Sequence, residues 1–98
     1  MTIKVTIKRH VRHGKEAKLN SLLIELRSRS LRRSGYLSGE TLVSAADPTV
    51  HLVISSWSTL EDWKSWENHP ERQELITKIN DLLVSAAELE VWSQRGPT

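Results

Sequence analysis

A chain of 98 residues, 27% of them charged, is long enough for one modest hydrophobic core and too short for two. The formal net charge of +2 is too small to imply a polyanionic partner, and the lack of cysteine excludes disulfides, thiolate zinc sites and cysteine nucleophiles. We expect a cytoplasmic protein without membrane attachment, because no stretch approaches the roughly 20 apolar residues that span a bilayer and the first residues lack the apolar run of a signal peptide.

The N-terminal third predicts a strand followed by an amphipathic helix. In residues 3–8, isoleucine and valine alternate with lysine and threonine, which places the β-branched side chains on one face of a half-buried strand. Between residues 15 and 33, leucines recur at positions i, i+3, i+4 and i+7. This spacing predicts a helix that ends near Arg33, before Gly35.

The next two strands form a predicted hairpin. Residues 36–45 and 50–58 are rich in β-branched and other apolar side chains, and the short A-D-P-T turn at 46–49 joins them. The second of these strands contains V-H-L-V-I, so apolar residues point to both of its faces, where a surface strand would alternate. We therefore expect it at the centre of a sheet, covered on both sides.

Two helical segments follow the hairpin. A capping box at residues 58–61 predicts the start of a short helix that carries two tryptophans. The N-H-P-E sequence at 68–71 interrupts this helix and starts another, because proline is tolerated only in the first turn. Leucine and isoleucine at helical spacing between 75 and 83 mark the buried face of the second segment.

The resulting order is βαββαβ, the ferredoxin-like α+β fold, in which helices cover one face of a four-stranded antiparallel sheet. Alternating residues 87–92 supply the closing strand, so one domain is expected over 1–95 with a tail at 96–98. The other face of the sheet would be bare, although its central strand is apolar on that side too. The economical cover is the same face of a second copy, and we expect a homodimer.

The segment S-W-S-T-L-E-D-W-K-S-W-E-N-H-P-E-R at 56–72 resembles the antibiotic biosynthesis monooxygenase family of small dimeric α/β-barrel proteins. The resemblance extends over nearly the whole chain, through G-Y at 35–36 and G-E-T at 39–41. It implies a cofactor-independent monooxygenase that uses dioxygen on a small quinol or polyketide-like aromatic, bound in a cavity between helices and sheet. No cofactor is expected for this chemistry.

A haem-degrading branch of the same family is an alternative. That branch uses an Asn on the first strand, a Trp on the short helix and a His further on as axial ligand. The corresponding positions here are Ile7, Trp66 and Ile76, so only the tryptophan matches. Two ways to supply the ligand stay open in this alternative: His69, or a shifted alignment.

Oxygenation without a cofactor needs a flat ring in a dry cavity, a base for the phenol proton and donors that stabilise the anion. Tryptophan makes up four of the five aromatic residues and supplies flat surfaces with an N–H donor. The expected substrate-binding residues are Tyr36, Trp57, Trp66, Arg72 and Trp92. The two tryptophans at 57 and 92 fit a dimer contact equally well, and the arginine fits an exposed first helical turn.

The expected catalytic residues are His51 and Trp66. Histidine is the natural proton acceptor near neutral pH, and His51 begins the central strand, from which it could point into the cavity. A surface or turn histidine is the alternative. Trp66 lies at the functional position that the resemblance implies, while Trp63, one turn earlier, shares a stripe with Leu60 and fits the core.

Other function classes are less well supported. His10 and His13 have a spacing that could hold a metal, but no cysteine or carboxylate pair completes a site, so none is expected. The first strand has no aromatic residue to stack on RNA, and no nucleic-acid partner is expected. Because a fold does not determine a function, a non-catalytic dimeric small-molecule-binding protein remains the main alternative.

Overall fold

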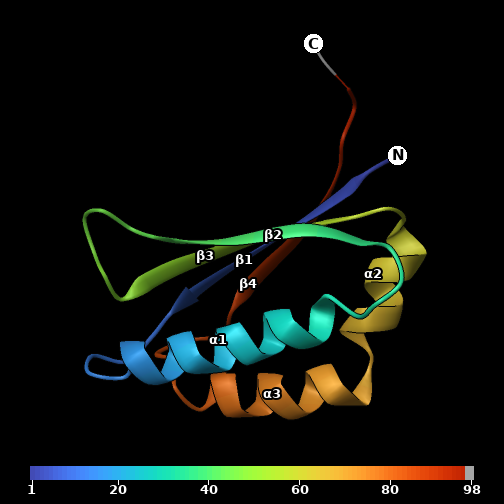
Figure 1. Cartoon of the computed structure of the whole chain (residues 1–98). Coiled ribbons are helices and arrows are strands. Elements are labelled where there is room, and N and C mark those ends of the chain that lie inside the picture. Colours follow the sequence, from blue (N-terminus) through green and yellow to red (C-terminus); the bar gives the residue numbers. More distant parts are fainter. Residues whose placement is uncertain (97–98) are drawn as a thin grey trace.

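The computed structural model describes residues 1–96, which form four strands and three helices. In chain order these are β1 (Ile3–His10), α1 (Glu16–Ser30), β2 (Tyr36–Val43), β3 (Val50–Trp57), α2 (Leu60–Glu67), α3 (Pro70–Asn80) and β4 (Glu88–Ser93). The helices lie on one face of an antiparallel sheet (Figure 1), which confirms the predicted α+β fold. Residues 97–98 of the expected tail lie outside the described residues. No helix within the described part is long and apolar enough to cross a membrane.

The strands are arranged in the order β2-β3-β1-β4, with every neighbouring pair antiparallel. The apolar strand β3 therefore lies inside the sheet, as predicted. Pairing of β1 with β3 runs from Ile3 opposite Trp57 to His10 opposite Val50. This register places the odd-numbered residues of both strands on the face that the helices cover.

The core consists of two apolar clusters that share partly buried contacts at Leu26, Val53 and Ala87. The first cluster joins the sheet to α2 and contains Ile3, Val5, Ile7, Trp57, Trp63 and Trp66. The second joins α1 to α3 and the segment after it, and contains Val11, Leu19, Leu23, Ile79, Leu82 and Leu83. Three of the four tryptophans are thus buried where α2 meets the sheet.

Two predicted boundaries of the helices need correction. Helix α1 ends at Ser30 rather than near Arg33, and turns connect it to β2. The cap of α2 is one residue later than predicted, because Thr59 accepts a hydrogen bond from the backbone N–H of Asp62 at 3.1 Å. Ser58 instead extends the strand pairing, since its N–H donates to the carbonyl of Gly35 at 2.8 Å.

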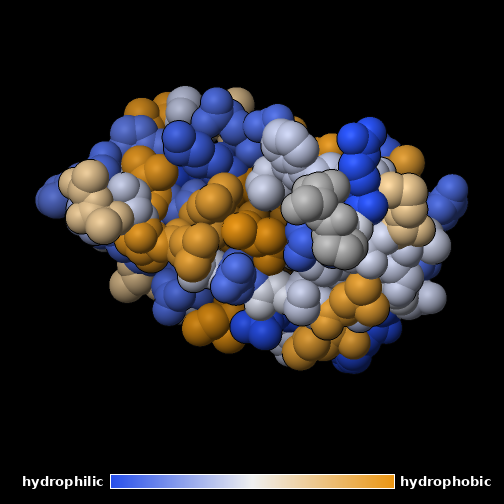
Figure 2. All heavy atoms as spheres, turned by 90° about the horizontal axis from the view of Figure 1, so that it is seen from above, coloured by the Kyte–Doolittle hydropathy of each residue, from blue (hydrophilic) through white to orange (hydrophobic). Residues whose placement is uncertain are grey.

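The face of the sheet away from the helices is open in the single chain. Figure 2 shows an apolar patch near its middle. By strand register Leu42, Leu52 and Ile54 share this face, and Leu42 is 46% exposed. The expectation that β3 is covered on both sides is therefore met on one side only within one copy of the chain.

Candidate functional site

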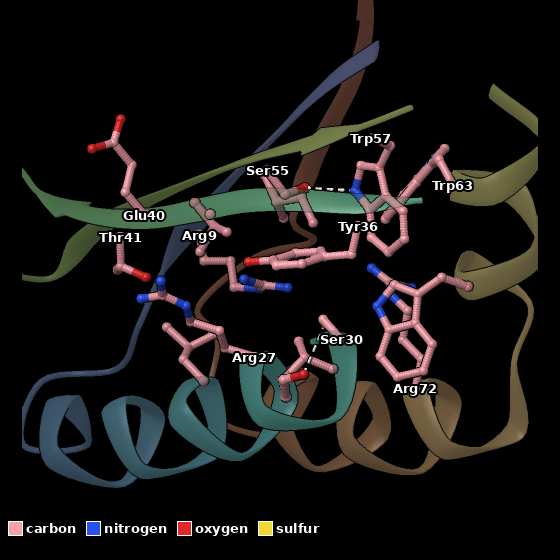
Figure 3. A pocket seen from close by; sticks show the side chains of 16 residues that line it. Arg9, Arg27, Ser30, Tyr36, Glu40, Thr41, Ser55, Trp57, Trp63 and Arg72 are labelled. Atoms are coloured by element: carbon pink, nitrogen blue, oxygen red, sulfur yellow. Dashed lines mark hydrogen bonds between the residues drawn. The ribbon is translucent and has the colours of Figure 1, made fainter. Parts of the chain in front are cut away.

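A cavity lies between the sheet and the helices, and side chains from β1, β2, β3 and all three helices line it (Figure 3). Its volume is about 60 Å³. This is less than half of the ~150 Å³ cavity that accommodates benzene in another protein. One aromatic ring is therefore the most that the cavity can take, and the ring fits only if lining side chains move apart.

Aromatic rings form one wall of the cavity. The ring of Tyr36 meets Trp57 edge-on, with centroids 5.2 Å apart and planes at 81°, and Trp57 packs against Trp63 at 5.7 Å. The indole N–H of Trp57 donates to the Ser55 hydroxyl at 3.1 Å, which fixes the orientation of that ring. Trp66 completes the wall from the next turn of α2.

The position of Tyr36 depends on an irregularity in β2. A shift in register between Tyr36 and Ser38 lets Tyr36 and Gly39 share the face that the helices cover. A Cβ at position 39 would collide with the hydroxyl of Tyr36. Gly39 therefore leaves room for the tyrosine to lie along the strand and reach the cavity.

Two buried arginines face these rings. Arg9, at the end of β1, is only 2% exposed, and its Nε and Nη1 atoms have no hydrogen-bond partner among the described residues. Burial, helped by the nearby charge of Arg72, lowers the pKa of Arg9 to about 10, so Arg9 is cationic at neutral pH. A buried guanidinium without a partner is costly in free energy, which points to a role other than stability.

Arg72, from the first turn of α3, is 5% exposed and approaches from another side. Its guanidinium carbon lies 5.1 Å from the centroid of the Trp63 ring, and Nη1 donates to the carbonyl of Glu67 at 3.4 Å. Burial also lowers the pKa of Arg72. The cation–π contact and the carbonyl compensate only part of the lost hydration of this charge.

Carboxylate acceptors are scarce in the cavity. Glu40 is the only carboxylate residue that lines it within the described chain, and its side chain points away (Figure 3). The indole N–H of Trp63 has no partner either. A cavity with unpaired donors, two buried arginines, a third and exposed arginine at Arg27, and aromatic walls is suited to a flat ligand that brings its own acceptor oxygen.

Four of the six predicted site residues meet at this cavity: Tyr36, Trp57, Trp66 and Arg72. The other two lie elsewhere. His51 is buried but does not line the cavity, and its Nε2 donates to the carbonyl of Pro48 at 3.1 Å. Trp92 lies on the open face of the sheet, 51% exposed, where its N–H donates to the Thr6 hydroxyl at 3.1 Å. The predicted roles of His51 and Trp92 stay predictions.

His69, the alternative haem ligand, caps helix α3. Its Nδ1 accepts a hydrogen bond from the backbone N–H of Glu71 at 3.1 Å, and its Nε2 lies 2.9 Å from Nη1 of Arg33. The ring of His69 does not line the cavity. Within residues 1–96, no group of three or more His, Cys, Asp or Glu side chains is placed to hold a metal ion.

Sequence reasoning missed Arg9. The signal was present, because the alternation of Ile3, Val5 and Ile7 continues by one more step and places Arg9 on the same buried face. A charged residue in phase with a buried row is unusual, and such residues are good candidates for a site.

Solved structures share this fold at low sequence identity. A conserved protein from Methanosarcina mazei Go1 superposes with a TM-score of 0.92 at 15% identity, over 97% of this chain and 94% of that chain. SnoaB, a cofactor-independent oxygenase from Streptomyces nogalater, gives 0.88 at 16% identity over 98% and 95%. Rv0793 from Mycobacterium tuberculosis gives 0.89 at 13% identity over 99% and 98%.

A sequence search among curated proteins finds no match. The sequence profile of one family does match, and it covers residues 2–78, which is most of the chain and includes every cavity residue described above. This chain belongs to the antibiotic biosynthesis monooxygenase family.

Proposed function

We propose that the protein is a cofactor-independent monooxygenase that oxidises a small aromatic molecule, a quinol or polyketide-like phenol. The observation that carries the proposal is the cavity in which Tyr36, Trp57 and Trp66 meet two buried arginines. Membership of the family and the likeness to a cofactor-independent oxygenase support this class of reaction. The small volume of the cavity limits a substrate to inserting at most a single ring.

The chemistry requires an electron-rich substrate. An ionised phenol or quinol can give electrons directly to dioxygen, after which one oxygen atom enters the ring and the other leaves as water. The substrate supplies all the electrons, so the tasks of the protein are to orient the ring, exclude water and stabilise the anion. Arg9 and Arg72 are placed for the last of these tasks, and the aromatic wall for the first two.

Oxygen uptake with a panel of hydroquinones and anthrone-like phenols tests the proposal. Trp66→Ala removes part of the wall, and we expect it to lower kcat/KM by about tenfold or more, because a misplaced ring loses the aligned geometry. His51→Ala tests the predicted base: a large loss of uptake would support that role, and unchanged uptake would limit His51 to holding its turn. Absence of uptake with every substrate would contradict the monooxygenase assignment.

A second candidate is a small-molecule-binding protein without turnover. It is favoured by one observation: among the described residues that line the cavity there is no histidine, and the one carboxylate points away. Titration of intrinsic tryptophan fluorescence with the same phenols distinguishes the two. Saturable quenching without oxygen consumption would support the binding role.

We also propose that two copies associate through the open face of the sheet. The exposed Leu42 and its neighbours Leu52 and Ile54 support this arrangement, because apolar patches of this kind are typical of interfaces. An isologous contact would bury the same patch on both copies.

A further inference from the structure

The cavity contains two buried positive charges that no ion pair within the described chain neutralises, and only Arg72 feels a nearby carboxylate, that of Glu67. Neither Arg9 nor Arg72 forms an ion pair with a described residue, whereas arginines elsewhere do, for example Arg29 with Glu25 at 2.7 Å. The chain thus pairs a partly exposed arginine and leaves its buried ones unpaired, which is the reverse of the usual pattern.

The two charges also act on each other. The charge of Arg72 contributes to the lowered pKa of Arg9, so bringing the two arginines to one cavity costs free energy. An anion placed between the two guanidinium groups would remove this repulsion and pair both cations. It would also give the Nε and Nη1 atoms of Arg9 acceptors, which they lack among the described residues.

The anion must be attached to a ring. Most of the lining is apolar or aromatic, including Ile7, Leu23, Leu26 and the three buried tryptophans. Figure 3 shows Arg9 entering from the sheet, Trp57 and Trp63 at the opposite end, and the Tyr36 ring between them. A bare inorganic ion would pair with the arginines but leave this apolar space unfilled.

We infer that the cavity binds an aromatic ligand in its anionic form, with a ring-attached oxyanion held between Arg9 and Arg72. The ring part of this inference rests on the proposed function, but the anion part requires no turnover. The oxyanion is either a carboxylate or an ionised phenol, and the two arginines fit both because each presents several N–H donors to oxygen.

Binding of benzoate and benzamide to the full chain tests the inference. The two probes have nearly the same shape and differ in charge. Their affinities are measured by calorimetric titration at fixed ionic strength, under nitrogen so that no oxidation takes place. We expect benzoate to bind about tenfold or more tightly than benzamide, because charge-assisted hydrogen bonds in a buried site are strong. The affinity for 4-nitrophenol, measured at one pH below and one pH above the pKa of the phenol, shows whether the cavity also binds an ionised phenol.

Three variants assign the effect. Arg9→Met and Arg72→Met should each abolish most of the preference for benzoate, whereas Arg32→Met, which removes the same charge from an exposed position outside the cavity, should preserve it. Should either methionine variant fail to fold, Arg9→Lys and Arg72→Lys keep the charge and should reduce the preference only in part.

Equal or tighter binding of benzamide by the wild type would overturn the inference, as would a full benzoate preference in Arg9→Met. Displacement of benzoate by equimolar inorganic phosphate would also overturn it, because the ring would then contribute nothing. These results are independent of the proposed oxygenation. A preference for benzoate without oxygen uptake would support the anion site and contradict the proposed function. Oxygen uptake without that preference would support the proposed function and contradict the anion site.

Discussion

The hydroxyl group of Tyr36 occupies the space that a Cβ at position 39 would need, so the tyrosine reaches the cavity only because residue 39 is glycine. The ring carbon that carries the hydroxyl is 3.5 Å from the same point, which is an ordinary contact distance. Only the hydroxyl is therefore in conflict with a larger residue. Gly39 sets how deep the tyrosine lies, and through it the shape of one cavity wall.

We predict that Gly39→Ala destabilises the protein and that Tyr36→Phe rescues it. The added methyl group forces the Tyr36 hydroxyl to move, whereas phenylalanine has no atom at that place. Urea unfolding of the two single variants and the double variant should give a coupling energy of about 0.5–3 kcal/mol in favour of the double variant. Additive effects would mean that the hydroxyl does not limit residue 39.

Arg9 should cost the protein stability. Methionine at this position has a similar reach without a charge, and we expect Arg9→Met to raise the free energy of unfolding by about 1–4 kcal/mol, since replacing buried charge by apolar groups often stabilises. Thermal unfolding followed by circular dichroism measures the change. The control Arg32→Met should stay within about 0.5 kcal/mol of the wild type. A lower melting temperature for Arg9→Met would show that an unrecognised partner stabilises this arginine.

Association of two copies should depend on the open face of the sheet. We predict that the wild type sediments at micromolar concentration with twice the 11.2 kDa mass of one chain. Leu42→Lys places a charge on the apolar patch and should shift the protein to the single-chain mass, because a buried unpaired charge is costly. Leu31→Lys is the matched control, since Leu31 is exposed but follows α1 on the helix side. A well-folded wild type that sediments as one chain would refute the dimer.

The turn between β2 and β3 predicts a dependence of stability on pH. The Asp47 carboxylate accepts hydrogen bonds from the hydroxyl of Thr49 at 2.6 Å and from its backbone N–H at 3.0 Å, and these lower the pKa of Asp47 below its ordinary 3.8. A carboxylate with a lowered folded pKa stabilises the fold above the unfolded pKa and loses this contribution as the pH falls through the folded value.

Asp47→Ala should therefore lower the melting temperature at pH 7. The difference from the wild type should shrink progressively below pH 3.8 as Asp47 becomes protonated. Melting curves at a series of pH values check this. A difference that stays constant down to about pH 2 would mean that Asp47 acts through its backbone conformation and not through its charge.

The sequence was sufficient to predict the fold, because each element carries its own periodic signal. The alternation in residues 3–8, the two-sided apolar strand at 50–58 and the proline at the start of α3 are local patterns, and all three agree with the structure. The errors concern helix boundaries, and the cause of the error at α2 is not local. Whether Ser58 or Thr59 caps α2 depends on how far the strand pairing extends, and that depends on a partner distant in the chain.

The site was only partly predictable. Trp92 alternates with Leu89 and Val91 along β4, and this alternation alone places it on the face away from the cavity. His51 lies on the same face of β3 as Trp57, the face that the helices cover. The two residues are six positions apart, however, which is about 20 Å at 3.3 Å per residue, so one small ligand cannot contact both. The irregularity at residues 36–38, which turns Tyr36 toward the helices, has no clear signature in the sequence.

The buried charge at position 9 has a practical consequence for laboratory evolution. A screen that rewards heat resistance alone should repeatedly recover aliphatic residues there, because nothing in such a screen requires the guanidinium. Clones selected in this way would look improved by every biophysical criterion and would have lost one of the two buried cations that line the cavity. Any effort to make this scaffold more robust should therefore hold position 9 constant.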